Sequence, residues 1–429
     1  MLLRDRSPPS SPGGFAVSGA RDPGRPGPSV PTGTCHHRPM TETADVIVVG
    51  AGVQGASLAF HLAQRGARVL VLERGSVASG ATGRSSGFVR MHYDLESESR
   101  LAWASFPYFL AWADMVGEGD CGFVRTGFLH LVPAELAGAL QANVAMHQRI
   151  GIETRVVGPA DVAHLVPGAV TDDLTVGAYE PESGYADPSG TATGFLAAAR
   201  GHGATVVQRC RVGSVLVEGE AVVGVDTDRG RFAAPVVVDA AGAWAAELAR
   251  TAGVEVPVQA WRHATAYFGL PDGRGPDFPI VIDELNQAYF RPEGREMMLV
   301  GLEHGNEVGG SPDRPLETLR PGSIDEMVSR VCARVPWMAD GTLRTGHGGQ
   351  DGITPDQRAI LGRAGPDGFI LACGFSGTGF KTAPAVGRCL AELILDGRAT
   401  TVDLAGYALD RFAAGRPLVG DHPYGVLWR

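Results

Sequence analysis

The sequence predicts an α/β fold with a partly parallel sheet, into which a second domain of α+β type is inserted. Residues 45–49 form a short apolar strand, a helical pattern follows as far as Arg65, and 68–72 is apolar again, which makes a strand–helix–strand unit. Helical and strand-like runs also alternate after Tyr185. From about 256 to 340 the chain instead has aromatic, strand-like runs broken by Pro and Gly, which favours an antiparallel sheet.

The order of these patterns predicts how the chain divides into domains. We assign the first domain to 44–100, 185–255 and 341–410, the inserted substrate domain to 101–184 and 256–340, and a tail to 411–429. Residues 1–43 are predicted to be a disordered leader, because Pro and Gly are frequent there and large apolar side chains are few. Met40 stands just ahead of the first strand, so we expect the natural protein to start there.

The length of 429 residues is sufficient for two ordinary domains. The composition, 44% hydrophobic and 20% charged, is typical of a globular protein. A net charge of -10 without a dense Lys/Arg run excludes nucleic acid and anionic membranes as expected partners and leaves small molecules. No apolar run approaches the roughly 18 residues of a membrane-spanning helix, and the leader lacks a secretory signal. We therefore expect a cytoplasmic protein.

Metal-binding patterns are absent from the sequence. The six cysteines include no CxxC pair and no ligand-like cluster, which predicts reduced, mostly buried thiols. His36 and His37 are adjacent, but lone adjacent histidines in a flexible tail usually face solvent. We expect no metal site.

The segment Gly50-Ala-Gly-Val-Gln-Gly55 matches GxGxxG between a predicted strand and a predicted helix. Gly50 permits the tight turn, Gly52 the approach of a pyrophosphate, and Gly55 close packing of the helix, whose N-terminus favours the phosphates. The next strand ends in Glu73, about twenty residues on, where a carboxylate can accept hydrogen bonds from an adenosine ribose. This context predicts a dinucleotide site, to which we also assign Val53, Gln54 and Arg74.

A second glycine-rich loop, Ser79-Gly-Ala-Thr-Gly-Arg-Ser-Ser-Gly87, offers backbone donors to a cofactor longer than the turn alone can hold. From it we assign Thr82, Arg84, Ser85, Ser86 and Gly87. With this loop, the sequence resembles the FAD-dependent amino-acid and amine oxidase family, which includes D-amino-acid oxidase, glycine oxidase and sarcosine oxidase. The resemblance covers about 44–400 and also rests on the segments 236–244 and 354–387; it is nearest to sarcosine oxidase β subunit-like proteins.

The resemblance implies a Rossmann-like FAD-binding domain and places the cofactor beside Ala241 and Gly242, although close packing alone also explains two small residues after a buried strand. It likens the segment 374–381, before a helix, to the isoalloxazine loop, where the helix N-terminus stabilises negative charge on the reduced flavin. The residues that it adds to the cofactor site are Val212, Ala241, Gly242, Trp244, Gly349, Gly374, Gly377, Thr378, Gly379 and Lys381. FAD is expected to be non-covalent, because Gly348–Asp351 and Arg84 replace the Cys and His that tether flavin in some relatives.

For the substrate, the resemblance implies a clamp of Arg90 and Lys381 that holds a carboxylate, since a guanidinium offers two hydrogen bonds and an ammonium adds a point charge. A structural salt bridge is the alternative for both. Tyr289 is a third candidate, as a residue facing the substrate or as ordinary core. His92, His263 and His304 are possible proton carriers, and none of them is singled out.

The expected reaction is FAD-dependent oxidation of the C–N bond of a carboxylate-bearing amine, by hydride transfer, to an imine that water hydrolyses. A secondary or N-methyl amino acid is the leading substrate class; glycine or a D-amino acid is the alternative. The electron acceptor is oxygen or another carrier, and oxygen is in doubt because Leu299 stands where monomeric sarcosine oxidases have an oxygen-activating lysine. Partner subunits are left open, as is a flavin-bound subunit that serves mainly in assembly.

Overall fold

The computed structural model describes residues 40–314 and 319–424. Its first sheet has six strands in the order β10-β3-β2-β14-β22-β21, all parallel except for β21. The strands are β10 (Thr205–Gln208), β3 (Val69–Glu73), β2 (Val46–Val49), β14 (Val236–Asp239), β22 (Phe369–Cys373) and β21 (Ile360–Arg363). The predicted α/β fold with a partly parallel sheet is confirmed.

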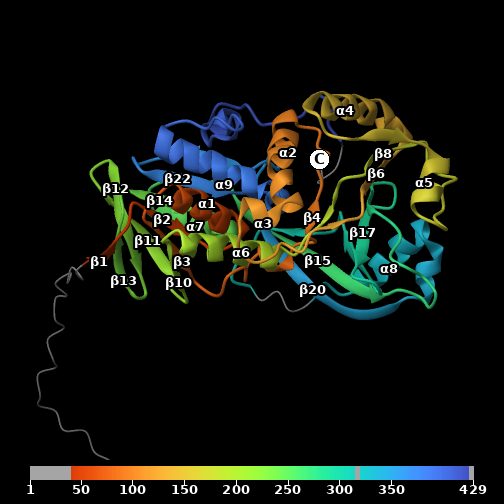
Figure 1. Cartoon of the computed structure of the whole chain (residues 1–429), viewed down its shortest axis with the longest axis horizontal. Coiled ribbons are helices and arrows are strands. Elements are labelled where there is room, and N and C mark those ends of the chain that lie inside the picture. Colours follow the sequence, from red (N-terminus) through yellow and green to blue (C-terminus); the bar gives the residue numbers. More distant parts are fainter. Residues whose placement is uncertain (1–39, 315–318, 425–429) are drawn as a thin grey trace, which may run out of the picture. The chain divides into compact units, whose positions relative to one another are not determined.

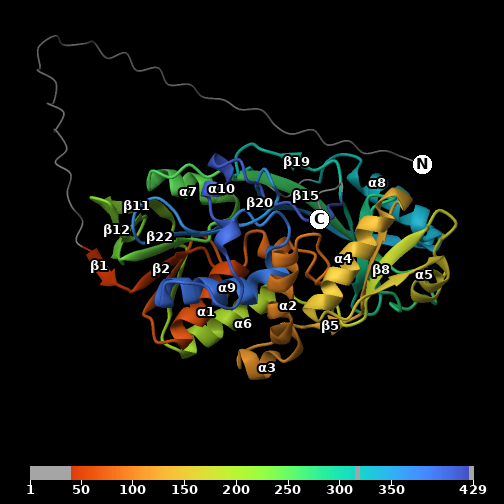
Figure 2. The same cartoon turned by 90° about the horizontal axis from the view of Figure 1, so that it is seen from above.

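Side chains alternate between the two faces of this sheet. In β2, Val46 and Val48 pack in one apolar cluster with helices, and Ile47 and Val49 pack in another. Figure 2 shows the helices of the first cluster together on one side of the sheet and α7 on the other. The first face is covered by α1 (Val53–Gln64), α6 (Pro188–Gly201) and α9 (Gly379–Asp396), and the second by α7 (Ala245–Thr251) and a sheet of β1 (Met40–Thr43), β13 (Gly230–Ala233), β12 (Ala221–Thr227) and β11 (Val212–Glu218).

The second large sheet lies at the right-hand side of Figure 1. Its pairs are antiparallel except for β16 with β6, and α8 (Ser323–Arg334) packs on its apolar core. Its strands are β19 (Glu307–Val308), β15 (Gln259–Gly269), β18 (Met297–Leu302), β17 (Ala288–Glu293), β16 (Ile280–Asp283), β6 (Phe128–Val132), β8 (Val176–Glu180), β7 (Arg155–Val157) and β20 (Thr342–Ile353). The antiparallel sheet predicted for the inserted part is therefore present.

Two elements lie on the other side of the boundaries expected from the sequence. The strand β20, assigned to the first domain, pairs along its whole length with β15 of the second sheet. Helix α2 (Glu96–Leu110), mostly assigned to the inserted domain, packs on α9 and contributes Leu101 and Phe106 to the core beside α1. The described residues form a single compact unit, so the division into two domains stays a prediction.

The remaining elements connect or cover these sheets. A short sheet is formed by β4 (Phe88–Val89), β9 (Gly184–Tyr185) and β5 (Val124–Arg125). The other helices are α3 (Trp112–Met115), α4 (Ala137–Ile150), α5 (Pro159–Leu165) and α10 (Asp410–Ala413), with short 3-10 turns at Thr82–Arg84, Ala134–Leu136, Gly242–Trp244, Pro336–Asp340 and Ala405–Tyr407. None of the helices in the described part of the chain is long and apolar enough to cross a membrane.

The segment expected to be a tail is anchored to the fold over its described residues. Arg411 forms a buried ion pair of 2.7 Å with Asp356, and Tyr424 is buried. Most of the leader predicted at 1–43 lies outside the described residues, as do Cys35, His36 and His37. The other five cysteines are free, and all of them except Cys332 are buried, as expected.

Candidate functional site

The turn between β2 and α1 is closed in a way that requires glycine. Gly50 has a φ of +109°, and a Cβ there would lie 2.5 Å from the carbonyl oxygen of Ala240. At Gly55 a Cβ would lie 2.1 Å from the carbonyl oxygen of Gly50. Both contacts are too short for any side chain, so these glycines are needed for the turn and for the packing of α1 against β2.

The N-terminus of α1 is open to an anion. Gly52, the residue before the helix, provides no side-chain cap, and the first turn contains no acidic residue. The hydroxyl of Thr82 accepts a hydrogen bond of 3.0 Å from the N–H of Val53, which joins the second glycine-rich loop to the start of the helix. The unpaired N–H groups and the helix dipole therefore favour a phosphate at this point.

A cavity of about 570 Å³ follows this turn and the second loop, a volume suited to a cofactor. It includes most of the residues that the sequence predicts to bind the cofactor. Those that line it are Gly50, Gly52, Val53, Gln54, Glu73, Arg74, Thr82, Arg84, Ser85, Ser86, Val212, Ala241, Gly242, Trp244, Gly377 and Gly379. Tyr289, predicted to face the substrate, lines it as well.

Several predicted residues do not line the cavity, and most of these are glycines that the backbone requires. Gly87 has a φ of +72°, and a Cβ at Gly349 would lie 2.3 Å from the ring of His263, which itself lines the cavity. Such glycines do not contact the cavity, but they leave room for the residues that line it. The predicted residues outside the lining are Gly55, Gly87, Gly349, Gly374, Thr378, Arg90 and Lys381.

The carboxylate of Glu73, at the end of β3, is held by backbone groups. It accepts hydrogen bonds from the N–H of Ala51 at 2.8 Å and from that of Gly75 at 2.7 Å. These bonds fix the acid beside the glycine turn, where the sequence places the adenosine ribose. The neighbouring Arg74 lies over the ring of Trp244, 4.5 Å from its centroid.

Asp313 completes this end of the cavity and was missed by the sequence analysis. Its carboxylate pairs with Arg74 at 2.8 Å and accepts a hydrogen bond of 2.9 Å from the indole of Trp244. Asp313 belongs to the connection after β19, far from the cofactor motifs in the sequence. No local pattern marks it.

Asp351, near the end of β20, is a second missed residue. Its carboxylate lines the cavity and accepts hydrogen bonds from the N–H of Gly377 at 2.8 Å and from that of Gly352 at 2.7 Å. Burial raises the pKa of this carboxyl. The sequence contained a signal for this residue, because Gly348-Gly349-Gln350-Asp351 lies in a segment that the resemblance places near the flavin.

Arg90, which follows β4, is almost fully buried. Its guanidinium lies 4.2 Å from the ring centroid of Tyr93 and 5.3 Å from that of Phe128, and Nη1 donates a hydrogen bond to the carbonyl of His92. Its Nε and Nη2 are buried and have no hydrogen-bond partner among the described residues. Two nitrogens of the Arg90 guanidinium are therefore left to donate hydrogen bonds to an anion.

Lys381 lies in the first turn of α9 and is also buried. Its Nζ donates a hydrogen bond of 3.2 Å to the carbonyl of Gly377 and lies 6.0 Å from the ring centroid of Tyr93. Burial, and next the positive charge of Arg90, lower the pKa of Lys381 to about 7. The fold thus brings the two predicted clamp residues to the same tyrosine, behind the wall of the cavity.

Tyr289 belongs to a small apolar cluster at the edge of the cavity. Its ring packs edge-on against Phe88, with centroids 5.4 Å apart, and burial raises the pKa of its phenol to about 12. Leu299 is fully buried in the same cluster. Among the histidines left open by the sequence, His263 lines the cavity, whereas His92 and His304 do not.

Comparisons with known proteins show the family of the chain. The family model of the FAD-dependent oxidoreductases, DAO, matches residues 45–393. The chain is 29% identical over 399 residues to the mitochondrial sarcosine dehydrogenase of Homo sapiens, covering 90% of this chain and 43% of that one. It is 27% identical over 381 residues to the glycine oxidase of Geobacillus kaustophilus, covering 87% of this chain and 98% of that one.

A solved structure, the L-proline dehydrogenase from P. horikoshii, has a TM-score of 0.82 and 27% identity, covering 88% of this chain and all of the other. The chain spans less than half of the length of the sarcosine dehydrogenases that it matches. The glycine turn, the open N-terminus of α1 and the cavity fit FAD, which is the cofactor of this family. The family match extends over most of the described fold, and the chain therefore belongs to the FAD-dependent oxidoreductases.

Proposed function

We propose that this chain oxidises the C–N bond of a carboxylate-bearing amine, with a secondary or N-methyl amino acid as the leading substrate class. The observation that carries the proposal is the pair Arg90 and Lys381. Both are buried cations, they lie at one tyrosine ring, and neither forms an ion pair within the described part of the chain. A buried positive charge without a counterion is costly, and a substrate carboxylate would supply that counterion.

The roles of the side chains follow from their chemistry. Bound FAD would supply the acceptor for a hydride from the carbon next to the substrate nitrogen. The two unpartnered nitrogens of Arg90 would hold the carboxylate through two hydrogen bonds, and Lys381 would add its charge. Tyr289 lines the cavity and packs against Phe88, and this apolar pair would limit access of water to the reacting carbon.

The relatives support the substrate class, because the names of sarcosine dehydrogenase, glycine oxidase and L-proline dehydrogenase all refer to amines that carry a carboxylate. They include secondary and primary amines, so glycine or a D-amino acid is the second candidate. Four further points stay predictions from the sequence. They are the electron acceptor, which is oxygen or another carrier, the possible partner subunits, a role mainly in assembly, and a cytoplasmic location.

A panel of amines tests the proposal. The purified flavoprotein is mixed without oxygen with sarcosine, proline, glycine and D-alanine, and with the corresponding amines that lack the carboxylate. We expect the yellow flavin absorbance to be bleached by carboxylate-bearing amines, and by the secondary ones at the lowest concentration. Bleaching by none of them would overturn the proposal. Air admitted after bleaching then reports whether oxygen is the acceptor.

A further inference from the structure

We propose that His92, His147 and Glu180 form a buried site for a divalent transition metal of the zinc class. The three residues offer ligand atoms that all lie within 4.8 Å of one another, and all three side chains are buried. None of them lines the flavin cavity. The site shares no ligand with the proposed clamp, but it lies next to it, because Arg90 donates a hydrogen bond to the carbonyl of His92. The proposal differs from the expectation from the sequence that the protein has no metal site.

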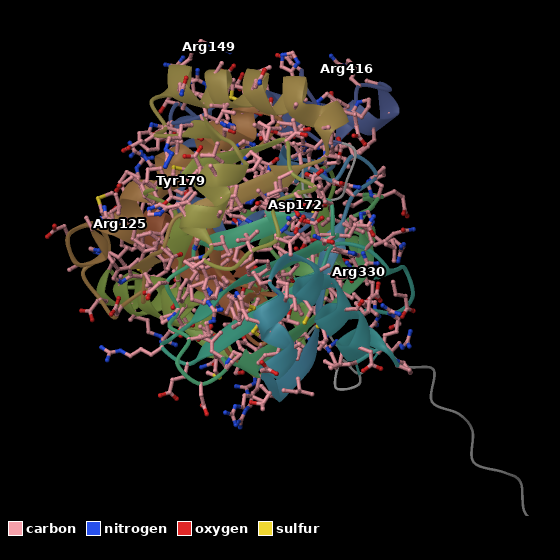
Figure 3. All side chains as sticks on the ribbon, turned by 90° about the vertical axis from the view of Figure 1, so that its right-hand side faces the viewer. Arg125, Arg149, Asp172, Tyr179, Arg330 and Arg416 are labelled. Atoms are coloured by element: carbon pink, nitrogen blue, oxygen red, sulfur yellow. The ribbon has the colours of Figure 1, made fainter. Side chains whose placement is uncertain are left out.

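Three separate elements bring the ligands together. His92 follows β4, His147 lies in the last turn of α4, and Glu180 ends β8. In Figure 3, the labels of Arg149 and Tyr179 identify α4 and β8, the elements that contain His147 and Glu180. The rings of His92 and His147 have their centroids 4.6 Å apart.

Hydrogen bonds orient each ligand and leave one atom of it free. The Nε2 of His147 lies 2.8 Å from the carbonyl oxygen of Tyr93. The N–H of Tyr93 lies 3.3 Å from the same nitrogen, so the shorter contact, to a carbonyl that only accepts, favours the tautomer with the hydrogen on Nε2 and the lone pair on Nδ1. The Nε2 of His92 lies 2.8 Å from the hydroxyl of Tyr424, and when the hydroxyl accepts this hydrogen bond the lone pair of His92 is on Nδ1.

Glu180 is oriented in the same way. Its Oε2 accepts a hydrogen bond of 3.0 Å from the N–H of Met91 and one of 2.7 Å from the hydroxyl of Ser183. The remaining atoms, Nδ1 of His92, Nδ1 of His147 and Oε1 of Glu180, are buried and have no hydrogen-bond partner among the described residues, and we infer that they are the atoms that bind the metal. Histidines and carboxylates that bind metals are typically held by such outer hydrogen bonds.

The kind of ligand selects the kind of metal. Two imidazole nitrogens and one carboxylate oxygen suit Zn²⁺ and its neighbours, whereas Mg²⁺ and Ca²⁺ require oxygen ligands. A single ion would satisfy three buried polar atoms that otherwise have no partner. Arg90 adds positive charge nearby, and the buried Glu284 contacts His130 at 2.7 Å, whose ring centroid lies 5.1 Å from that of His92.

Metal content of the flavin-loaded full chain tests the proposal. After growth with added zinc and gel filtration, elemental mass spectrometry should find close to one zinc ion per chain. His147→Ala and Glu180→Gln should each lower this content at least tenfold. Tyr424→Phe, which removes the outer hydrogen bond to His92, should keep the stoichiometry in excess zinc but weaken zinc affinity by about 10- to 100-fold.

A matched control is His61→Gln, because His61 is a buried histidine of α1 whose Nε2 contacts the Pro384 carbonyl, away from the cluster. It should keep the metal. The ratio of FAD to protein reports folding in every variant. If His147→Ala fails to fold, titration of the metal-depleted native chain with Co²⁺ shows whether the site binds a metal ion. Bound Co²⁺ in such a site can be followed because it absorbs at longer wavelengths than oxidised flavin. A native chain that takes up neither zinc nor Co²⁺, or variants that bind metal as well as the native chain, would overturn the site.

Discussion

The carboxylate of Asp351 accepts a hydrogen bond of 2.8 Å from the backbone N–H of Gly377, and this contact joins β20 to the loop before α9. The loop is the one that the sequence predicts at the isoalloxazine end of the flavin. Because β20 pairs with β15, the same contact ties the flavin loop to the second sheet. The position of Asp351 thus connects the two sheets at the cofactor.

The first prediction concerns this contact. Asp351→Leu removes both acceptor oxygens, and hydrogen bonds to a charged group contribute about 1.5–3 kcal/mol. We expect the Kd of FAD to rise by at least tenfold, measured by titrating the FAD-free protein with FAD and following flavin fluorescence. Asp351→Asn keeps one acceptor oxygen, so its Kd for FAD should lie between those of the native chain and Asp351→Leu. Equal affinity in all three proteins would show that the contact does not position the cofactor.

The second prediction concerns Arg90. Arg90→Ala should weaken the binding of a substrate carboxylate by about 2–5 kcal/mol, the usual cost of removing one partner of a buried charge pair. FAD content should be unchanged, because Arg90 does not line the cavity. The readout is the substrate concentration that half-bleaches the flavin without oxygen. Arg125→Ala is the matched control, since Arg125 is exposed and pairs with Glu182 at the surface, and it should behave as the native chain.

The third prediction concerns Lys381. Burial lowers the pKa of its ammonium group to about 7. A bound carboxylate favours the protonated lysine, so binding should be tightest below about pH 7 and weaken as the pH rises and the free protein loses this charge. A carboxylate without an amine, such as propionate, isolates the effect because it does not titrate between pH 6 and 9. Its Kd, from the change in flavin absorbance, should rise toward higher pH. In Lys381→Met the Kd should be higher and independent of pH over this range.

Part of this site could be predicted from the sequence because its signals are local. Gly50, Gly52 and Glu73 lie within one strand–turn–helix–strand unit, so their spacing fixes their arrangement. The same holds for the loop of Ser79 to Gly87, most of which lines the cavity. The parallel sheet was predictable for the same reason.

The rest depends on contacts between distant segments. The segment of Asp351 carried a signal for the cofactor, but its contact with Gly377 and the pairing of β20 with β15 join segments that the sequence does not connect. Asp313 meets Arg74 from a connection that belongs to the other half of the chain. His92, His147 and Glu180 have no spacing typical of a metal motif, since each comes from a different element.

The last prediction concerns a buried charge cluster that joins the start of α2 to the segment before β21. Arg358, before β21, pairs with Asp94 and with Glu98 of α2, and all three side chains are buried. Arg358→Met would leave two buried carboxylates without their cation. Because a broken buried ion pair typically costs about 3–5 kcal/mol, we expect the free energy of unfolding to fall by that amount.

Urea unfolding of the FAD-free chain measures this change, since bound FAD would add its own stabilisation. The double variant Arg358→Met with Glu98→Gln removes one of the two orphaned charges and should recover part of the loss. Such recovery distinguishes an electrostatic cost from a loss of packing, because glutamine keeps the size of the side chain. A double variant that is less stable than Arg358→Met alone would contradict the ion-pair explanation.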